Sequence, residues 1–429
     1  MGEDKFDVII VGGGIAGSIA AHMLAEAGLE VVVIERGNSS GSKNMTGGRL
    51  YSHSLEKIIP NFADVAPVER KVTKERISML TNDSAFTIDY SSGKLGDTGK
   101  NSYVVLRGQF DRWLAEEAEN NGAMYIYGIR VDDLIVKDGK VCGVVAGDEE
   151  MLADVVILAD GVNSLLAQKL GMKKELSPHE VAVGAKEVIE LDEKTIRDRF
   201  NLSRNDGLAW LFAGAASAGH IGGGFLYTNK TSVSLGIVTT VGDIDHSDKS
   251  VPEMVEDFKN HPVIQPLIEG GKLIEYSAHL VPEGGYDTIS TLYKDGVVVV
   301  GDAANLVINI GYMVRGMDLA VESGKLAAET ILKAKEKNDF SANALSSYQA
   351  ALEASFVMKD LKHYKKFPHF MENHRIFNEY PEMIDDIMAD MFIVDGSEPR
   401  TLLSKVMNPA KKVGLMTLVK DGFKGVRSL

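Results

Sequence analysis

The chain has 429 residues, of which 45% are hydrophobic and 25% charged, enough for two or three domains with their own cores. Its formal net charge of −15 argues against a nucleic-acid partner, which needs a basic face. The only cysteine, Cys142, excludes an internal disulfide, a four-cysteine iron–sulfur cluster and a zinc ribbon within this chain, and it fits a reducing compartment.

Targeting and membrane signals are the next features to consider. The apolar segment 6–34 is broken by glycines and charged residues and lacks a basic leader, so we expect no signal peptide. No stretch reaches about eighteen uninterrupted apolar residues, so we expect no membrane span. The resulting expectation is a cytoplasmic protein, with peripheral contact at the inner face of the cell membrane kept open.

The N-terminal part reads as α/β. Apolar runs at 6–11 and 30–34 around an Ala-rich helical segment at 15–27 predict a βαβ unit, and the Gly-, Ser- and Asn-rich segment 37–50 predicts a loop. Strands are expected within 76–90, turning at 81–84.

The pattern continues along the chain. A strand at 103–106 leads into a helix at 108–121, a β-meander spans 123–147 with a turn at Asp138-Gly139, and a buried strand occupies 154–159. From 175 to 280, stretches rich in Val, Thr, Phe and Tyr alternate with glycines and predict an inserted antiparallel sheet. A buried strand at 296–300, a helix at 316–335 and a helical region after 340 complete the chain.

A glycine pattern joins the first predicted strand to the first helix. In Gly12-x-Gly14-x-x-Gly17, the first glycine permits a tight turn, the second lets the backbone approach a pyrophosphate, and the third packs helix on strand. Ala16, which lies between Gly14 and Gly17, is also a predicted cofactor-binding residue. Glu35 ends the second strand, where a carboxylate accepts hydrogen bonds from an adenosine ribose, and Arg36 follows it. Dinucleotide binding is the prediction.

Two acidic turns indicate which dinucleotide binds. Asp160-Gly161 and Gly301-Asp302 each follow a buried strand, at the end where open α/β sheets bind ligands. The plain interpretation of each is a turn with a capping aspartate. A carboxylate at Asp302 would serve the ribityl hydroxyls of FAD, whereas an NAD domain has no use for it. FAD is therefore the predicted cofactor.

The predicted fold class is α/β: a Rossmann-like FAD-binding domain with an inserted antiparallel-sheet substrate domain and a helical C-terminal region. The FAD-binding parts are 1–75, 102–174 and 281–335. The hairpin 76–101 and the segment 175–280 form the substrate domain, and 336–429 is the C-terminal region.

These motifs together resemble the p-hydroxybenzoate-hydroxylase-like flavoproteins, and within them the electron-transfer-flavoprotein:quinone oxidoreductases in their short, FixC-type form. The segments that carry the resemblance are KNMTGGRLY (43–51), GGGFLYTN (222–229), EYSAHLVP (275–282), RGMDLA (315–320), KKVG (411–414) and KDG (420–422). They cover nearly the whole chain.

The resemblance implies further roles. Arg107, in LRGQFDRWL, matches the arginine that begins the helix beside the FAD pyrophosphate. The long family members carry a cysteine cluster for an iron–sulfur centre, which this chain cannot hold. For the short form, the resemblance implies a separate ferredoxin-like iron–sulfur subunit, a two-subunit (alpha and beta) electron-transfer flavoprotein and a quinone, in a complex that includes the electron-bifurcating type.

Two glycine-containing segments have alternative interpretations. Thr46, Gly47 and Gly48 form either a mobile surface connection or a loop that closes over the isoalloxazine ring, which the resemblance favours. Gly316 and Met317 begin a helix whose N-terminus would stabilise negative charge on the reduced ring, or they are simply an irregular helix entry.

The remaining candidates lie toward the C-terminus. The spacing of His363, His369 and His374 puts them on no common helical face, so no metal site is predicted. Residues 400–429 carry a net charge of +6, with apolar residues interleaved. They predict either a helix with a solvated lysine face or a segment that contacts anionic lipid or an acidic partner.

The predicted function is FAD-dependent electron transfer from an electron-transfer flavoprotein to a quinone bound between the FAD domain and the inserted sheet, with Gly222–Gly224 as one wall. Such chemistry belongs to the flavin, and no general acid with an unusual pKa is expected. The alternatives are a prenyl or geranylgeranyl reductase, an aromatic hydroxylase, and an electron-relay subunit that turns over no small molecule.

Overall fold

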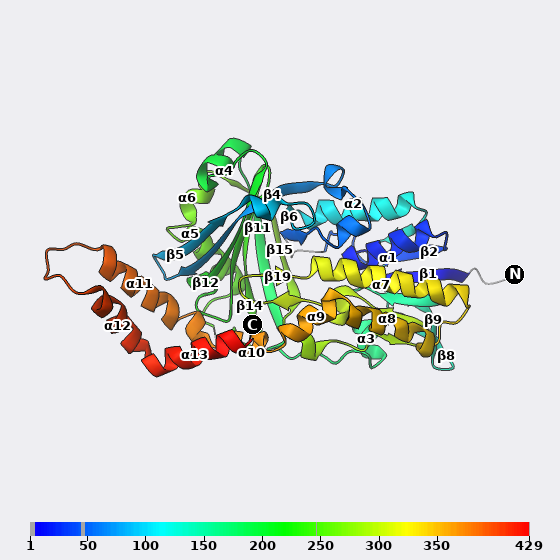
Figure 1. Ribbon diagram of the computed structural model, residues 1–429. Coiled ribbons are helices and arrows are strands. Elements are labelled where there is room, and N and C mark those ends of the chain that lie inside the picture. The colour runs from blue at the N-terminus through cyan, green and yellow to red at the C-terminus, as the bar shows by residue number, and fades with distance from the viewer. Residues whose placement is uncertain (1–4, 44–47, 246, 429) are drawn as a thin grey trace.

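The computed structural model describes residues 5–43, 48–245 and 247–428 (Figure 1). Within these residues the chain forms two large sheets, with helices against the first sheet and a run of helices at the C-terminus. In Figure 1 the second sheet lies between the first sheet, on the right, and helices α11–α13, on the left. The predicted α/β class, with an inserted sheet and a helical C-terminal region, is confirmed.

The first sheet is mostly parallel and buried. Its path is β16 (Tyr293–Lys294), β17 (Val297–Val299), β10 (Glu149–Leu158), β1 (Lys5–Val11), β2 (Val31–Glu35) and β7 (Met124–Tyr127), with β8 (Asp133–Lys137) and β9 (Lys140–Ala146) attached beside β10. Valine and isoleucine dominate its central strands, as expected when both faces of a parallel sheet are covered.

The register of this sheet brings the predicted motifs together. Val11 pairs with both Leu158 and Ile34, and Leu158 pairs with Val299. The carboxyl ends of β1, β2, β10 and β17 therefore meet at one edge of the sheet. The glycine pattern, Glu35, and the turns after β10 and β17 all lie at that edge.

Close helix packing depends on two glycines. A Cβ on Gly17, in α1 (Ile15–Glu26), would stand 2.1 Å from the Gly12 oxygen. A Cβ on Gly324, in α7 (Met317–Glu336), would stand 2.4 Å from the Ala16 oxygen. These contacts hold α1 against β1 and α7, which fixes the direction in which the N-terminus of α1 points.

The second sheet is mixed. Its path is β15 (Lys272–Pro282), β11 (Val181–Glu190), β14 (Ser232–Thr240), β13 (Gly222–Thr228), β12 (Asp206–Gly214), β4 (Val68–Leu80), β6 (Ser102–Val105) and β3 (Arg49–Tyr51), with β5 (Ala85–Ser91) paired to β4. The prediction of an antiparallel sheet is wrong at one place, because β12 pairs parallel with β4. That strand comes from an earlier part of the chain, which a local pattern does not reveal.

Two local predictions differ in detail. The hairpin turns at 81–84 as predicted, but β4 starts at Val68, so the boundary proposed at residue 75 falls inside a strand. In the predicted meander, β7 instead pairs parallel with β2, whereas β8 and β9 form a hairpin at Asp138-Gly139 and β9 pairs antiparallel with the start of β10. Alternation of apolar residues indicates a strand but not its partner.

The other helices connect the sheets and build the C-terminal region. They are α2 (Arg107–Asn120), α3 (Leu165–Lys169), α4 (Glu193–Phe200), α5 (Val251–Asn260), α6 (Gln265–Ile268), α8 (Ala342–Ala354), α9 (Phe356–His363), α10 (Phe367–Met371), α11 (Glu379–Phe392), α12 (Leu402–Val413) and α13 (Leu415–Ser428), with the short two-stranded ribbon β18 (Ile308–Asn309) and β19 (Val314–Arg315) before α7.

Helix α13 is fastened to the body through one buried carboxylate. Asp421 Oδ2 accepts hydrogen bonds from Arg375 Nε at 2.7 Å, Asn373 Nδ2 at 2.9 Å and Tyr380 Oη at 2.6 Å. Gly425, one turn further, lies against the Phe370 ring, where a Cβ would stand 3.0 Å from a ring carbon. The predicted lysine-rich tail therefore has an inner face that packs on the protein.

We expect Asp421→Asn to loosen α13 by about 1–2 kcal/mol, the value of charge-assisted hydrogen bonds discounted for the partly exposed Arg375. The hydrogen bond from Arg375 holds the pKa of Asp421 well below its usual range. A lowered pKa gives stability that is present above the unfolded-state value of about 3.9 and is lost as the pH falls. Hydrogen exchange of α13 amides should show this acid sensitivity in the wild type only. Equal exchange of the α13 amides in the wild type and in Asp421→Asn at neutral pH would contradict the predicted loosening of α13.

Candidate functional site

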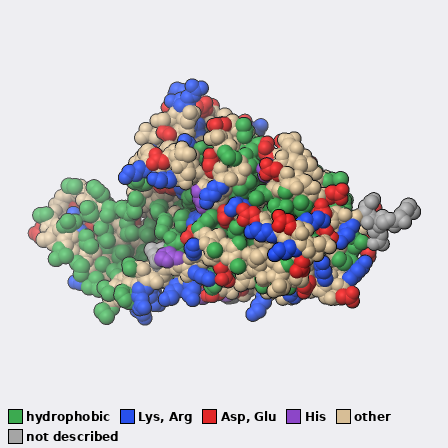
Figure 2. Space-filling model, turned by 45° about the vertical axis from the view of Figure 1, so that its right-hand side comes forward, with side chains coloured by type: hydrophobic (Ala, Val, Ile, Leu, Met, Phe, Trp, Pro, Cys, Tyr) green, Lys and Arg blue, Asp and Glu red, His purple; other side chains and the backbone are tan. Residues whose placement is uncertain are grey.

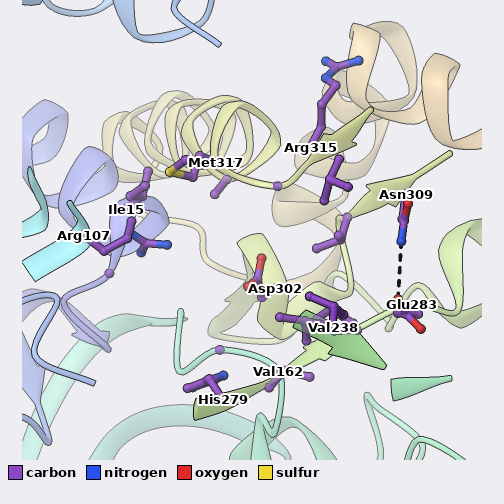
Figure 3. A pocket seen from close by; sticks show the side chains of 18 of the residues that line it. Ile15, Arg107, Val162, Val238, His279, Glu283, Asp302, Asn309, Arg315 and Met317 are labelled. Carbon is purple, nitrogen blue, oxygen red and sulfur yellow. Dashed lines mark hydrogen bonds between the residues drawn. The ribbon is translucent and has the colours of Figure 1, made fainter. Parts of the chain in front are cut away.

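One cavity of about 860 Å³ connects both sheets with the C-terminal region. It starts at the carboxyl ends of β1, β2, β10 and β17, passes between the second sheet and the start of α7, and reaches α10, α11 and α13. This volume lies within the range of cofactor and ligand sites. Figure 3 shows side chains from these different elements around it.

At one end of the cavity, Glu35 is tied to the glycine-rich turns. Its Oε2 accepts from the Gly13 amide at 2.9 Å and its Oε1 from the Gly37 amide at 2.6 Å. These bonds fix the carboxylate beside Gly12 and Gly14, with further acceptor capacity for ribose hydroxyls. Gly12 has φ +106°, and a Cβ there would stand 2.4 Å from the Ala159 oxygen, so only glycine fits.

Next along the cavity, the N-termini of α1 and α2 converge. Helix α1 begins at Ile15 with Gly14 as its N-cap, and α2 begins with Arg107. Arg107 makes a two-point ion pair with the buried Asp111, at 2.6 and 2.7 Å, which orients its guanidinium along the cavity wall. Helix N-termini and an arginine suit the two negative charges of a pyrophosphate.

The two acidic turns are linked by a buried lysine. Burial raises the pKa of Asp302, while Arg107, His279 and Lys173 act in the opposite direction. Lys173 Nζ donates to the Val162 oxygen at 2.6 Å and the Ala303 oxygen at 3.2 Å, so it joins the turns after β10 and β17. Burial lowers the pKa of Lys173 to about 8.

Asp160 and Gly161 form the other turn. Burial raises the pKa of Asp160, and a hydrogen bond from Ser164 Oγ at 2.9 Å opposes the shift. Both Asp160 and Asp302 line the cavity and can accept from hydroxyl groups.

At the centre of the cavity, the start of α7 faces the second sheet. Gly316 is the N-cap of α7 and Met317 its first residue. On the opposite side, a Cβ on Gly48 would stand 2.1 Å from the Tyr227 ring. Tyr227 and Phe225 form a tilted aromatic pair on β13, with ring centroids 5.5 Å apart. A flat ring system fits between such walls, and the N-terminus of α7 favours negative charge on it.

Most of the predicted site residues gather around this cavity: Gly12, Gly14, Ala16, Glu35, Arg36, Gly48, Arg107, Asp160, Gly161, Asp302, Gly316 and Met317 line it. Gly17 and Gly301 lie behind it and serve packing, since a Cβ on Gly301 would stand 3.0 Å from that of Ala16. Thr46 and Gly47 lie outside the described residues. The contacts of all these residues with a cofactor stay a prediction.

Other residues of the cavity wall carry no recognisable signal in the sequence. Glu283 and Asn309 are hydrogen-bonded to each other in the cavity wall, and Phe370, Phe377 and Tyr380 line the end formed by the C-terminal region. A single glutamate after a strand and aromatics in a helical region give no pattern of their own. Their role comes from distant parts of the chain that fold together.

Metal ligands are not grouped in the part of the chain that the structure describes. No cluster of three or more His, Cys, Asp or Glu side chains could hold an ion there. His374 pairs with Asp243 at 3.2 Å and His369 with Glu372 at 3.3 Å.

Comparison with known families and structures agrees with this geometry. Residues 5–197 match the FAD binding domain, 181–281 the ETF-QO, ubiquinone-binding domain, and 367–429 the ETF-QO/FixC family C-terminal domain. A geranylgeranyl bacteriochlorophyll reductase-like protein from Thermoplasma acidophilum superposes with a TM-score of 0.73 at 21% identity, covering 99% of this chain and all of that chain. The halogenase PltM, solved with FAD, has a TM-score of 0.64 at 16% identity, over 90% of this chain and 81% of its own.

Fold and site together define an FAD-dependent oxidoreductase. The chemistry of the donors and acceptors at this end of the cavity suits FAD: Glu35 and Asp302 would accept from ribose and ribityl hydroxyls, and the helix N-termini would face the pyrophosphate.

Full-length relatives then give the family. The chain is 56% identical to the probable electron transfer flavoprotein-quinone oxidoreductase YdiS and 52% identical to the protein FixC, both of Escherichia coli K12, over the whole of each chain. It therefore belongs to the ETF-QO/FixC family.

We expect Asp302→Ala to weaken FAD binding by about 1–3 kcal/mol, the cost of leaving a buried polar partner unpaired. Flavin release on dilution, followed by fluorescence, measures the loss. Asp287→Ala, at an exposed position, is the control and should retain flavin like the wild type. Unchanged retention in the Asp302 variant would place the ribityl chain elsewhere.

Proposed function

We propose that this chain takes electrons from a two-subunit electron-transfer flavoprotein and passes them to a quinone. One observation carries the proposal: the cavity that holds the FAD-type motifs continues past β13 to the C-terminal helices, where we propose that a second flat ligand binds beside the flavin. FAD, when bound, supplies two-electron redox chemistry, and the protein positions it and controls access.

The quinone would lie against the glycines of β13. Gly222, Gly223 and Gly224 line the cavity and present no side chains, so a quinone ring can approach the backbone there. Val238, on the adjoining strand β14, and Val281, on β15 further along the same sheet, add apolar surface to the cavity. Phe370 and Phe377 flank the path toward the C-terminal region, which suits an apolar tail.

The partners follow from the same account. Relatives of this chain are named FixC and electron transfer flavoprotein-quinone oxidoreductase, which supports an electron-transfer flavoprotein as donor. With one cysteine, this chain has no ligand set for an iron–sulfur cluster, so a ferredoxin-like subunit would carry it. We further propose that these subunits assemble with this chain into a complex, which is of the electron-bifurcating type only if the acceptor of the second electron is the ferredoxin-like subunit.

The protein would lie in the cytoplasm, with the outer surface of its C-terminal region against the inner face of the cell membrane. Met416, Val419, Phe423 and Val426 of α13 are exposed, with Val426 keeping 77% of its surface. Figure 2 shows hydrophobic side chains gathered over the end of the molecule formed by this region, with lysines and arginines along its lower edge. Apolar residues beside basic ones fit the surface of an anionic bilayer. Within the described residues, no helix combines the length and apolarity needed to cross a bilayer.

A lipid-reducing activity is the second candidate, because the same cavity could take a prenyl chain. It is favoured by the apolar end of the cavity at Phe370, Met371 and Phe377. An electron-relay role without small-molecule turnover is the third. Both leave the fold unchanged and differ only in what reoxidises the flavin.

The test is an anaerobic acceptor panel. The purified holoprotein is photoreduced and then mixed with a ubiquinone or menaquinone analogue, a geranylgeranyl lipid, an aromatic acid with oxygen, or a ferredoxin. Rapid reoxidation by quinone alone supports the proposal. Rapid reoxidation by the geranylgeranyl lipid but not by quinone would replace it with the reductase activity.

A further inference from the structure

Glu283 stands where the second sheet meets the flavin side of the cavity. It follows Pro282 at the end of β15, and its amide donates to the Glu180 oxygen at 2.8 Å, which fixes the backbone. Its side chain lines the cavity. The position is set by the fold and not by a mobile loop.

The Glu283 carboxyl connects the two walls between which the quinone would bind. Thr240 Oγ1, at the end of β14, donates to one carboxyl oxygen at 2.9 Å. Asn309 Nδ2, on β18, donates to the other at 3.4 Å, the contact drawn in Figure 3. Thr239, next to Thr240, pairs with Gly222. The carboxyl therefore lies beside the glycine wall and faces the segment that leads into α7.

The other carboxylates of the described cavity wall are already engaged or lie elsewhere. Glu35 accepts two amides at the far end, Asp302 lies near Arg107 and Lys173, and Asp421 is held by Arg375. Asp160 accepts from Ser164, and Asp132 accepts from Arg130 and the Gly147 amide. Glu283 has two neutral donors and, within the described residues, no ion pair. Burial raises its pKa, which favours the protonated form of the carboxyl.

Quinone reduction requires such a group. Conversion of a quinone to a quinol takes up two electrons and two protons, and two C=O bonds become C–O–H. Under the proposed function, FAD in its reduced state would supply the electron pair and one of the two protons. The second proton has to reach the other quinone oxygen, in a part of the cavity where the glycine wall offers only backbone groups.

We propose that Glu283 is the acid that delivers this proton, with Thr240 and Asn309 orienting its carboxyl. The Glu283 O–H bond breaks as the quinone O–H bond forms, and water at the cavity mouth returns a proton to the carboxylate. This inference rests on the proposed function and adds a catalytic residue to it. It also revises the expectation that no general acid with a shifted pKa is needed.

The alternative is a structural role in which Glu283 only ties β14 to β18. A comparison of two acceptors separates the roles. Ferrocenium takes one electron and no proton, whereas a short-chain ubiquinone analogue takes protons with its electrons. A structural defect would slow both reactions, and the loss of an acid would slow only the second.

The experiment uses photoreduced holoprotein in a stopped-flow instrument, with wild type, Glu283→Gln, Glu283→Asp and the control Asp287→Asn, an exposed carboxylate four residues further on. We expect Glu283→Gln to keep its FAD and melting temperature, to react normally with ferrocenium, and to react about a hundredfold more slowly with the quinone. Glu283→Asp, which keeps a proton, should be intermediate. Infrared difference spectra at neutral pH should contain a protonated carboxyl band that Glu283→Gln lacks.

Each outcome decides one point. Unchanged quinone reaction in Glu283→Gln, or equal slowing with both acceptors, overturns the role of Glu283 while the proposed function stands. A wild type that reacts with ferrocenium but not with quinone overturns the proposed function, and the role of Glu283 with it. If the glutamine variant loses FAD, the aspartate variant and the wild-type infrared band decide.

Discussion

Replacing Gly14 with valine is expected to give a folded but colourless protein. Gly14 has φ −78° and ψ −175°, a conformation open to valine, and its N-cap position makes no side-chain hydrogen bond that could be lost. Gly14 lines the cavity at the N-terminus of α1, where the pyrophosphate is proposed to lie, so we expect the added side chain to compete with it for space. Absorbance at the flavin band per mole of protein, together with the melting temperature, measures the two effects.

Substitutions at two other glycines serve as comparisons for the Gly14 variant. Gly93→Val, at an exposed position outside the cavity with no heavy atom within 4 Å of its Cβ, should keep full flavin content. Gly12→Val should instead damage the fold, because φ is +106° and a Cβ would press on the Ala159 oxygen. A yellow Gly14 variant with full flavin content would refute the placement of the cofactor.

Removal of residues 400–429 is expected to leave FAD bound and to abolish most of the reaction with long-tail quinone. The truncation deletes α12 and α13, whose Asp421, Gly422 and Gly425 close the far end of the cavity, whereas the predicted FAD contacts end at Met317. Reaction with a water-soluble short-chain analogue should fall much less. Initial rates on liposome-borne and soluble quinones give the comparison, and added salt should weaken only the liposome reaction.

A milder variant separates the membrane role from the cavity wall. Met416→Gln with Val419→Gln changes two exposed positions on α13 and leaves Asp421 in place. It should reproduce the loss on liposomes while the soluble analogue reacts normally. Equal losses with both quinones in the truncated protein would mean that the tail is structural.

The first βαβ unit was predictable because its signals are local. The glycine pattern, Glu35 and the apolar runs lie within a short stretch, and the parallel register then brings Asp160 and Asp302 to the same edge. Strand partners were not predictable in the same way. That β7 joins β2, and that β4 pairs parallel with β12, depends on contacts between distant segments.

The site shows the same division. The acidic turns were found from motifs and Arg107 from the family resemblance, but Glu283 was missed, because its significance comes from burial and from two donors on separate strands. The basic C-terminal segment was noticed by its charge, yet its inner face at Asp421 and Gly425 became visible only in the folded chain.

The most direct measurement is a crystal structure of the holoprotein with a short-chain ubiquinone analogue. We predict the quinone ring between the isoalloxazine and Gly222–Gly224, with one carbonyl oxygen within hydrogen-bonding distance of Glu283. A quinone bound at a site separated from the flavin, or a cavity beside β13 filled by a different ligand with no quinone density anywhere, would contradict the account.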